Sequence, residues 1–340
     1  MGDPTEKVDT NLPAEQKHVG DKYEVPTYEA HSSLDSLKQR IRHHYEIASD
    51  YYYSLWGQHI HHAYFLTPDD TKETGQTNLI NLLLEISKLA PNSTVLDVGC
   101  GIGGTTRHLA REHGCTVTGI TISGRQVQIA KRLTNDEASR EPGNSISNST
   151  TAAAKGPEGS DNFIPLGAKN GKVYYFELDA EKMESRFPPQ SFDCVWISEA
   201  LSHFPDKALF FRNASRVLRP NGKLVLADWF KSAPLTPEQT ENDIKPIEDG
   251  MLLPPLNTMA EYIAMAESAG LCVFHAPKDI SQQVARTWDI SWELVSNPSL
   301  WAFAISQGRD GLAFLQAFRA MRRGYSNGTF RYGVMCFEKA

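Results

Sequence analysis

The spacing of apolar positions changes along this chain, and each change predicts a different element. Near the N-terminal end, Leu34, Leu37, Ile41 and Tyr45 recur at the spacing of one helix face, and TNLINLLLEISKLA repeats that pattern over residues 77–90. Between the two, residues 48–65 hold a dense group of aromatic and histidine side chains. We expect residues 34–90 to form an N-terminal helical cap.

From residue 91 onward, short apolar runs alternate with helical patterns. Strands are predicted over residues 94–100, 115–121, 172–180, 192–200 and 223–230, with helices after the first, second and fourth. Such alternation predicts a parallel sheet covered by helices on both faces. A further strand is predicted over 271–280, and Asn327-Gly328 is typical hairpin chemistry, so the sheet is expected to end in an antiparallel pair.

Three stretches interrupt this regularity. Residues 1–33 mix Pro, Gly, Lys and Glu without periodicity and are expected to form a disordered tail. Residues 134–172 are rich in Ser, Asn, Gly and Pro and are expected to form a disordered insertion in the main domain, residues 91–340. Residues 231–257 are irregular and precede a helix that opens with a capping box at Thr258 and Glu261.

Composition and net charge limit the classes of binding partner and the cellular compartment that we expect. The chain has 340 residues, a formal net charge of -7 and no cluster of Lys and Arg, which argues against nucleic acid as a partner. Its five cysteines are scattered without a C-x-x-C pair, which indicates a reducing compartment. With neither a signal-peptide core nor a membrane-spanning run, a cytoplasmic protein with no stable membrane insertion is expected.

The clearest candidate for chemistry is VLDVGCGIGGTTRHLA, residues 95–110, in which Gly99, Gly101 and Gly104 match the dinucleotide fingerprint. A turn of this kind brings a ligand close to the backbone at a helix N-terminus. No Gly-Lys-Ser/Thr follows, which argues against a nucleoside triphosphate. Asp97 would repel a diphosphate, and Thr121 stands where the ribose-binding acid of an NAD site belongs. The loop therefore favours a cationic nucleoside, and an NAD-dependent oxidoreductase is the distant alternative.

LDVGCGIGG resembles motif I of the class I S-adenosylmethionine-dependent methyltransferases. HYEIASDYYYSLWGQHIHHAYF, GITISGRQ, ELDAEKMESRFPPQSFDCVW and SEALSHFPDK are similar to further segments of γ-tocopherol methyltransferases, sterol C-methyltransferases and, more distantly, cyclopropane fatty acid synthases. The resemblance covers residues 38–338 without the insertion, and RYGVMCFEK favours the γ-tocopherol branch. It implies a Rossmann-like, seven-stranded, mostly parallel sheet with an antiparallel last strand, and S-adenosyl-L-methionine as cofactor.

The resemblance also implies roles for single residues. Gly99, Gly101 and Gly103 would let the backbone meet the methionine part of the cofactor, and Asp97 would hold its amino end directly or through water. Thr121 and Gln126 would hold the ribose or the methionine carboxylate, and Tyr45 would close over the sulfonium, which an aromatic face attracts. The complete expected cofactor site is Tyr45, Asp97, Gly99, Cys100, Gly101, Gly103, Thr121, Ile122, Gln126, Asp179, Ala180 and Ser198.

Two of these residues have ordinary structural alternatives. Ser123 and Gln126 form an S-x-x-Q capping box that any helix start could use. Asp179, which with Ala180 resembles the pair that meets the adenine amino group, could instead be a solvated turn residue. Tyr52, Tyr53 and Trp56 are assigned to packing.

Glu199 and His203 are the candidates for a general base, which is needed only where the acceptor must lose a proton. Four residues apart after the fourth strand, they are expected on one side of a helical turn at the carboxyl edge of the sheet. Alternatively, His203 is a loop histidine with satisfied hydrogen bonds and Glu199 orients the cofactor.

His59, His61 and His62 invite a metal interpretation, but no acidic or cysteine partner has a suitable spacing, so structural or acceptor contacts are expected and no metal. Trp229, Trp288, Trp292 and Trp301 could line an aromatic acceptor pocket, although Trp at helical spacing is more often core. Residues 231–257 and 281–323 are the expected lid and acceptor-site segments.

The sequence thus predicts a methyltransferase that acts on a small, largely apolar metabolite of secondary metabolism at carbon, nitrogen or oxygen. The alternative is a sterol or lipid C-methyltransferase or a cyclopropane synthase-like enzyme, although the FEH motif of the latter is missing and no basic amphipathic helix offers a membrane dock. A third hypothesis is that the chain is a non-catalytic member of the family that binds the cofactor.

Overall fold

An eight-stranded sheet forms the centre of the protein, in the order β3-β4-β2-β1-β5-β6-β8-β7. The computed structural model describes residues 37–43, 45–46, 49, 53, 56–140, 163–294 and 308–340. Five neighbouring strands run parallel: β1 (Thr94–Val98), β2 (Thr116–Thr121), β4 (Gly171–Glu177), β5 (Phe192–Ser198) and β6 (Leu218–Lys231). The predicted fold class is confirmed.

The two edges of the sheet carry the antiparallel strands. β8 (Phe330–Lys339) lies antiparallel to both β6 and β7 (Leu271–Asp279). This agrees with the prediction that the sheet ends in an antiparallel pair. At the opposite edge, β3 (Ile164–Leu166) pairs antiparallel with β4. This short strand raises the count from the expected seven to eight, and it falls inside the stretch expected to be a disordered insertion.

Helices cover both faces of the sheet, because successive strand residues alternate in direction. Val95 belongs to the core on one face and Leu96 to the core on the other. The first face carries α3 (Lys72–Ser87), α4 (Gly104–His113) and α5 (Gly124–Ala138). The second carries α6 (Lys207–Val217), α9 (Met259–Ser268) and the 3-10 helix η1 (Ala180–Ser185).

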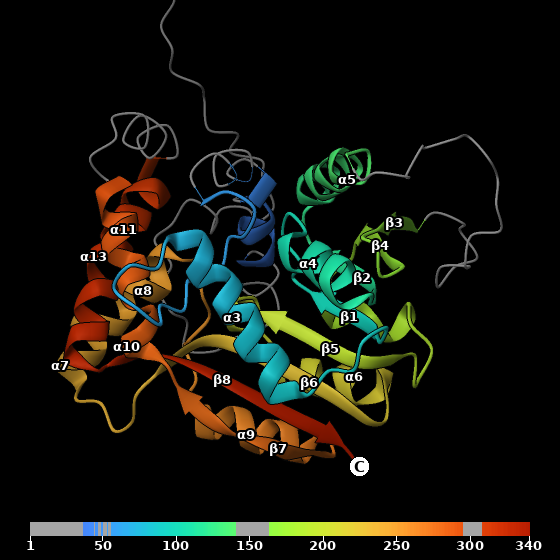
Figure 1. The fold of residues 1–340 in the computed structure, drawn as a ribbon. Coiled ribbons are helices and arrows are strands. Elements are labelled where there is room, and N and C mark those ends of the chain that lie inside the picture. The colour runs from blue at the N-terminus through green and yellow to red at the C-terminus, as the bar shows by residue number, and fades with distance from the viewer. Residues whose placement is uncertain are drawn as a thin grey trace, which may run out of the picture.

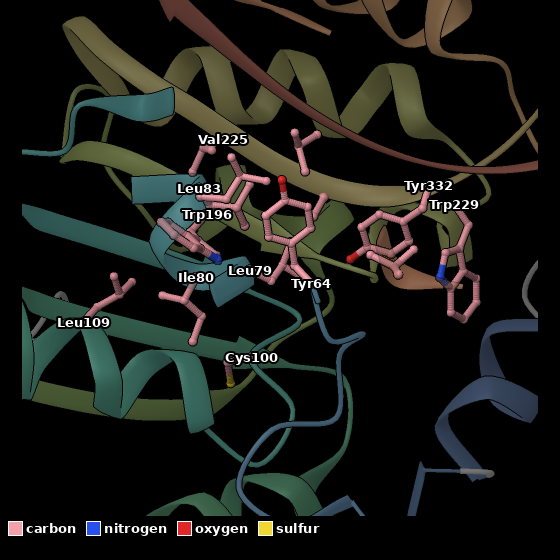
Figure 2. Close-up of a cluster of buried hydrophobic side chains, with 14 of the residues drawn as sticks. Tyr64, Leu79, Ile80, Leu83, Cys100, Leu109, Trp196, Val225, Trp229 and Tyr332 are labelled. Atoms are coloured by element: carbon pink, nitrogen blue, oxygen red, sulfur yellow. The ribbon is translucent and has the colours of Figure 1, made fainter. Parts of the chain in front are cut away.

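Helix α3 shows that the expected N-terminal cap has two parts. Its Leu79, Ile80 and Leu83 share a core cluster with Trp196 and Val225 of the sheet, and the helix lies across the sheet rather than over its end (Figures 1 and 2). It therefore belongs to the main layer structure. The described residues between 37 and 46 instead reach the cavity described below.

The insertion predicted over residues 134–172 is wrong at both ends. Helix α5 continues to Ala138 because Thr134 and Ala138 are buried, and the Thr134 hydroxyl lies 3.2 Å from the Tyr175 hydroxyl of β4. At the C-terminal end of the expected insertion, β3 and the first residues of β4 form regular strands. Residues 141–162 of the expected insertion lie outside the described residues, as does the tail over 1–33.

A group of helices gathers at one end of the sheet (Figure 1). It contains α7 (Pro237–Gln239), the π-helix η3 (Thr240–Ile244), α8 (Lys245–Gly250), α10 (Ser281–Val284), α11 (Arg286–Leu294) and α13 (Gly308–Asn327), and α13 packs against α8, α11 and η3. The hairpin predicted at Asn327-Gly328 is wrong. Asn327 ends α13 and Gly328, with φ of 71°, follows it, since the left-handed backbone that suits a hairpin turn also ends a helix.

Two further observations concern the whole described chain. None of the five cysteines is in a disulfide, and only Cys272 is exposed. In the ranges that the structure describes, no helix combines the length and the apolar character needed to cross a bilayer.

Candidate active site

A cavity lies at the carboxyl ends of the parallel strands, where ligands of open α/β sheets collect. Nearly all predicted site residues line it; Gly103 alone does not. Topology brings them together, because β1, β2, β4 and β5 all end at this edge. The predicted residues in the wall are Tyr45, Asp97, Gly99, Cys100, Gly101, Thr121, Ile122, Gln126, Asp179, Ala180, Ser198, Glu199 and His203.

The glycine loop is a tight turn between β1 and α4. The backbone N–H groups of Gly99 and Cys100 both donate to the Ile120 carbonyl, at 2.9 and 3.0 Å. Gly99 has φ of 70°, and a Cβ added to it would lie 2.4 Å from the Ala200 Cβ. The turn therefore tolerates no side chain at Gly99.

Gly103, the remaining predicted glycine of the loop, packs against Tyr175 of β4. A Cβ at this position would lie 2.6 Å from the Tyr175 hydroxyl oxygen, so its missing side chain lets Tyr175 pack against the loop. Gly103 is also the N-cap of α4. The structure thus gives it a packing role behind the cavity wall.

Asp97 is a buried carboxyl at the end of β1, with 3% of its surface exposed. The Thr106 hydroxyl donates to its Oδ2 at 2.5 Å. Burial raises the pKa of Asp97 to about 7, although the Thr106 hydrogen bond lowers it. A neighbouring cation would favour the carboxylate again. An ammonium group therefore fits this position, which is the chemistry of the amino end of S-adenosyl-L-methionine.

Thr121 and Gln126 are joined to each other in the cavity wall. The Thr121 hydroxyl donates to Gln126 Oε1 at 2.6 Å, while Ser123 Oγ accepts from the Gln126 backbone N–H at 3.2 Å. The helix cap at Ser123 is therefore real, but the Gln126 side chain does not return to it. The capping alternative explains Ser123 and leaves the buried Gln126 side chain to the cavity.

Asp179 uses both carboxylate oxygens within the protein. Its Oδ1 accepts from the Glu181 N–H at 3.0 Å, which caps η1, and its Oδ2 pairs with Lys38 at 3.1 Å. Lys38 also pairs with Glu181. The turn-residue alternative thus describes its contacts, while its position borders the cavity.

Three described residues of the segment 37–46, Lys38, Ile41 and Tyr45, border the cavity. Besides the Lys38 contacts, Arg42 pairs with Glu177, and Glu46 accepts from the Ser123 hydroxyl at 2.9 Å. Tyr45 OH lies 3.4 Å from His203 Nε2. Burial and then the charge of Glu199 raise the pKa of Tyr45 to about 12, so its hydroxyl keeps its proton.

Glu199 and His203 do not form the expected pair. Glu199 has φ of 54° and lies outside the 3-10 helix η2 (Leu201–His203), so the two residues do not share a helical turn. Its carboxylate instead accepts from the His62 N–H at 2.6 Å and the Tyr332 hydroxyl at 2.7 Å, and it faces His62 Nδ1 at 2.9 Å.

Those contacts decide the charge of Glu199. Burial raises its pKa, but the electrostatic interaction and the hydrogen bonds with His62 together lower it by more, so the pKa lies below its usual value. A carboxylate held by several donors is poorly placed to take a proton from a substrate. The prediction of Glu199 as a general base therefore loses its geometric support.

His62 is the partner that the sequence did not identify. Its Nε2 lies 2.6 Å from Trp288 Nε1, which can only donate, so Nε2 accepts and the ring proton sits on Nδ1, facing Glu199. The Tyr325 hydroxyl lies 3.3 Å from the same Nε2. His62 thus ties α11 and α13 to the ends of β5 and β8. The only signal in the sequence was the run of three closely spaced histidines.

An aromatic and aliphatic wall forms the rest of the cavity. Trp229 packs edge-on to His62, with ring centroids 5.9 Å apart, and lies 6.2 Å from the His203 ring (Figure 2 shows Trp229). The wall residues from the expected lid segments are Gly250, Met251, Leu252, Thr287, Trp288 and Phe318.

Some of the remaining aromatic candidates line the cavity and others do not. Trp56 lines the cavity, contrary to its assignment to packing alone, and Tyr53 does not line it. Trp292 lies outside it, under the guanidinium groups of Arg319 and Arg322 at 5.6 and 5.4 Å from its centroid. Tyr52 and Trp301 lie outside the described residues. Across the part of the chain with described placement, no group of three potential ligands could hold a metal ion.

Two protein families match this chain. Residues 96–226 match the family described as methyltransferase domain, and residues 32–146 match the mycolic acid cyclopropane synthetases. Among solved structures, the cyclopropane synthase MmaA2 from Mycobacterium tuberculosis superposes with a TM-score of 0.69 at 20% identity, covering 89% of this chain and 98% of that one. This likeness concerns the fold.

Curated relatives carry the comparison further. The 27-O-demethylrifamycin SV methyltransferase of Amycolatopsis mediterranei is 32% identical over 72% of this chain and 77% of its own length. The probable tocopherol O-methyltransferase of Oryza sativa subsp. japonica is 27% identical over 89% of this chain and 78% of its own length. The 2-methyl-6-phytyl-1,4-hydroquinone methyltransferase of Synechocystis is 36% identical over 51% of this chain, a match that spans 45% of that relative.

Proposed function

This chain belongs to the S-adenosylmethionine-dependent methyltransferases, and we propose that it methylates a small, largely apolar metabolite at carbon, nitrogen or oxygen. S-Adenosyl-L-methionine supplies an electrophilic methyl group on a sulfonium. The relatives include enzymes named for a tocopherol and for a demethylrifamycin, which supports an apolar acceptor of secondary metabolism here as well.

One observation carries the proposal: a single cavity joins a polar cofactor side to an aromatic side. Asp97, Gly99 and Gln126 line the first part, and Trp229 and Trp288 line the second. Methyl transfer needs its two reactants held in line and shielded from water. The aromatic wall supplies that shielding and favours an apolar acceptor.

On the cofactor side, the chain's own groups match the parts of the cofactor. The Asp97 carboxylate holds the ammonium, and the glycine turn lets backbone approach the methionine part. Thr121 and Gln126 face the ribose or the carboxylate, and Asp179 and Ala180 border the adenine. The 37–46 segment closes over this side through Lys38 and Tyr45.

On the acceptor side, Glu199 acts as a positioning residue. Its hydrogen bonds to His62 and Tyr332 hold the floor of the cavity, and His62 in turn holds Trp288. His203, whose Nε2 faces the Tyr45 hydroxyl at 3.4 Å, stays a candidate for contact with the reacting atoms.

A lipid acceptor is the second candidate. The match of residues 32–146 to the mycolic acid cyclopropane synthetases favours it. Such an enzyme would leave a methylated sterol or a methylene-bridged acyl chain in the membranes of cells that express it, and mass spectrometry of extracted lipids detects both.

The test combines two measurements on the purified protein. Calorimetry with S-adenosylhomocysteine is expected to give a defined 1:1 binding curve, and NAD is expected to give none. The protein is then incubated with methyl-labelled S-adenosylmethionine and fractions of an apolar metabolite extract, and the labelled product is identified by mass spectrometry. Binding without any labelled product would point to the non-catalytic member of the family.

A further inference from the structure

Beside the aromatic wall of the cavity, two buried polar atoms lack a hydrogen-bond partner among the described residues. They are Nε2 of His61 and Nε1 of Trp229. His61 is 8% exposed and Trp229 is 7% exposed. Buried polar atoms in folded proteins are nearly always hydrogen-bonded, so two unmatched atoms at one ligand cavity indicate what the ligand supplies.

The chemistry of each atom is fixed. An indole Nε1 can only donate. His61 Nδ1 lies 2.9 Å from the His62 carbonyl oxygen, which can only accept, so Nδ1 carries the ring proton and Nε2 presents a lone pair. These two atoms are therefore one unmatched donor and one unmatched acceptor.

A third such atom, Nδ1 of His59, belongs to the cofactor side. It would lie 2.7 Å from a Cβ on Gly104, at the start of α4 beside the glycine loop. The His59 and His61 rings are neighbours, with centroids 5.1 Å apart. His61 is also adjacent to His62, whose ring packs against Trp229 and Trp288 of the aromatic wall.

We propose that His61 is a catalytic residue that accepts the proton of the methylated atom, and that Trp229 donates a hydrogen bond to an oxygen elsewhere in the acceptor molecule. The acceptor is then an apolar compound with an N–H or O–H at the reacting atom and a separate carbonyl, ether or hydroxyl oxygen. This inference rests on the proposed function and narrows its substrate class.

The proton transfer balances. The reacting atom forms a bond to the methyl carbon with its lone pair, and the carbon–sulfur bond breaks with its electrons staying on sulfur, which becomes a neutral thioether. The N–H or O–H bond breaks, and its proton forms a bond to the lone pair of His61 Nε2. The positive charge that the sulfonium loses appears on the imidazolium of His61, which later releases the proton to water.

The surroundings of His61 keep it ready to accept. Burial lowers its pKa, while the charge of Glu199 and the hydrogen bond to the His62 carbonyl raise it and the His62 ring lowers it. His59 and His108 of α4 are the other titratable groups that face it. The net pKa lies below the usual histidine value, so the ring is neutral at pH 7. His203 is less suited, since its Nε2 faces the Tyr45 hydroxyl.

The first test needs no acceptor. Nitrogen NMR of ¹⁵N-histidine-labelled protein at pH 7 is expected to show His61 as the Nδ1–H tautomer with an unprotonated Nε2, assigned through the His61→Gln variant. Addition of S-adenosylhomocysteine is expected to leave the His61 Nε2 resonance unchanged. A large shift of that resonance would mean that the cofactor, and not the acceptor, meets His61, which overturns the proposal.

The second test uses the acceptor that the labelling screen identifies. His61→Gln keeps a hydrogen-bond acceptor but cannot take a proton, so kcat is expected to fall at least about 100-fold. The acid limb of the pH–kcat profile should vanish, with the Kd for S-adenosylhomocysteine within about twofold of wild type because the cofactor contacts are intact. Trp229→Phe keeps the ring without the N–H, so KM is expected to rise about fivefold, the equivalent of one neutral hydrogen bond, with little change in kcat.

The controls separate the possible failures. His113→Gln changes a histidine of α4 outside the cavity and should keep the wild-type profile. His61→Asn, which can still donate to the His62 carbonyl, replaces His61→Gln if that variant does not fold. An acid limb that persists in His61→Gln but is lost in His203→Gln refutes the proposal and assigns the proton to His203. A wild-type enzyme that methylates nothing contradicts the proposed function itself.

Discussion

The buried carboxyl of Asp97 makes a quantitative prediction about cofactor binding. Burial raises its pKa from 3.8 to about 7, so in the empty cavity it is mostly protonated below pH 7. The ammonium of S-adenosylhomocysteine needs the carboxylate form. Affinity is therefore expected to fall as the pH drops through 7, because an increasing fraction of the binding energy is spent on removing the Asp97 proton.

The size of this effect follows from the titration. With a pKa near 7, about 3% of Asp97 is ionised at pH 5.5 and about 75% at pH 7.5. The observed Kd should thus rise about 25-fold between pH 7.5 and pH 5.5. Measurements stop at pH 7.5, where most of Asp97 is already ionised.

Isothermal titration calorimetry measures both the affinity and the proton. In buffers of different ionisation enthalpy at pH 6, binding is expected to release close to one proton. Asp97→Asn should bind weakly at every pH, without the acid limb and without proton release. 5′-Methylthioadenosine, which lacks the amino acid part, should bind wild type with no such limb. A Kd that is constant from pH 5.5 to 7.5, or an unchanged limb in Asp97→Asn, would refute the reasoning.

Other predictions concern stability and closure. Asp97→Asn should raise the free energy of unfolding of the cofactor-free protein at pH 8 by up to about 4 kcal/mol. The reason is that an Asp97 pKa raised to about 7 in the folded state destabilises the wild-type fold progressively as the pH rises from 3.8 to 7. Urea unfolding at pH 8 and pH 4 checks this prediction, and an equal change at both pH values would contradict it. Gly103→Ala, which combines a φ of 78° with a clash against Tyr175, should lower the melting temperature more than Gly101→Ala, which has the strain of a φ of 54° without a clash and should in addition weaken S-adenosylhomocysteine binding. Glu199→Gln should cost about 1–3 kcal/mol of unfolding free energy, since its amide offers one acceptor oxygen in place of two, and a change below about 0.5 kcal/mol would argue against the network. Lys38→Gln should raise the Kd for S-adenosylhomocysteine only about two- to fivefold, as expected for a half-buried ion pair, and isothermal titration calorimetry measures this Kd.

The cofactor half of the site was predictable from local patterns. A strand that ends in Asp97 and runs into a glycine turn places backbone and carboxylate next to a ligand whatever the rest of the chain does. The third and fourth motifs also fall at strand ends, and parallel strands bring such ends to one edge. Gly103 is the exception, because only the position of Tyr175, far away in the sequence, shows that this glycine serves packing.

The acceptor half depended on contacts between distant segments. Glu199 and His203 have helical spacing, but the left-handed backbone at Glu199 turns its carboxylate to His62 and Tyr332. Nothing in the spacing of residues 199–203 could indicate partners 137 and 133 positions away. For the same reason the sequence could not show that both ring nitrogens of His62 have partners, while the Nε2 of neighbouring His61 has none among the described residues.

The sequence by itself determined the helices and strands of the main layers, their alternation, the glycine turn and the class of cofactor. Those features depend on periodicity and on residues close together in the chain. Only the tertiary structure decided that α3 covers the sheet, that Asn327-Gly328 ends a helix, and that the Nε2 of His61 has no partner within the described part of the chain. Each of these features depends on contacts between side chains that are distant in the sequence. A local sequence pattern is compatible with more than one set of such contacts.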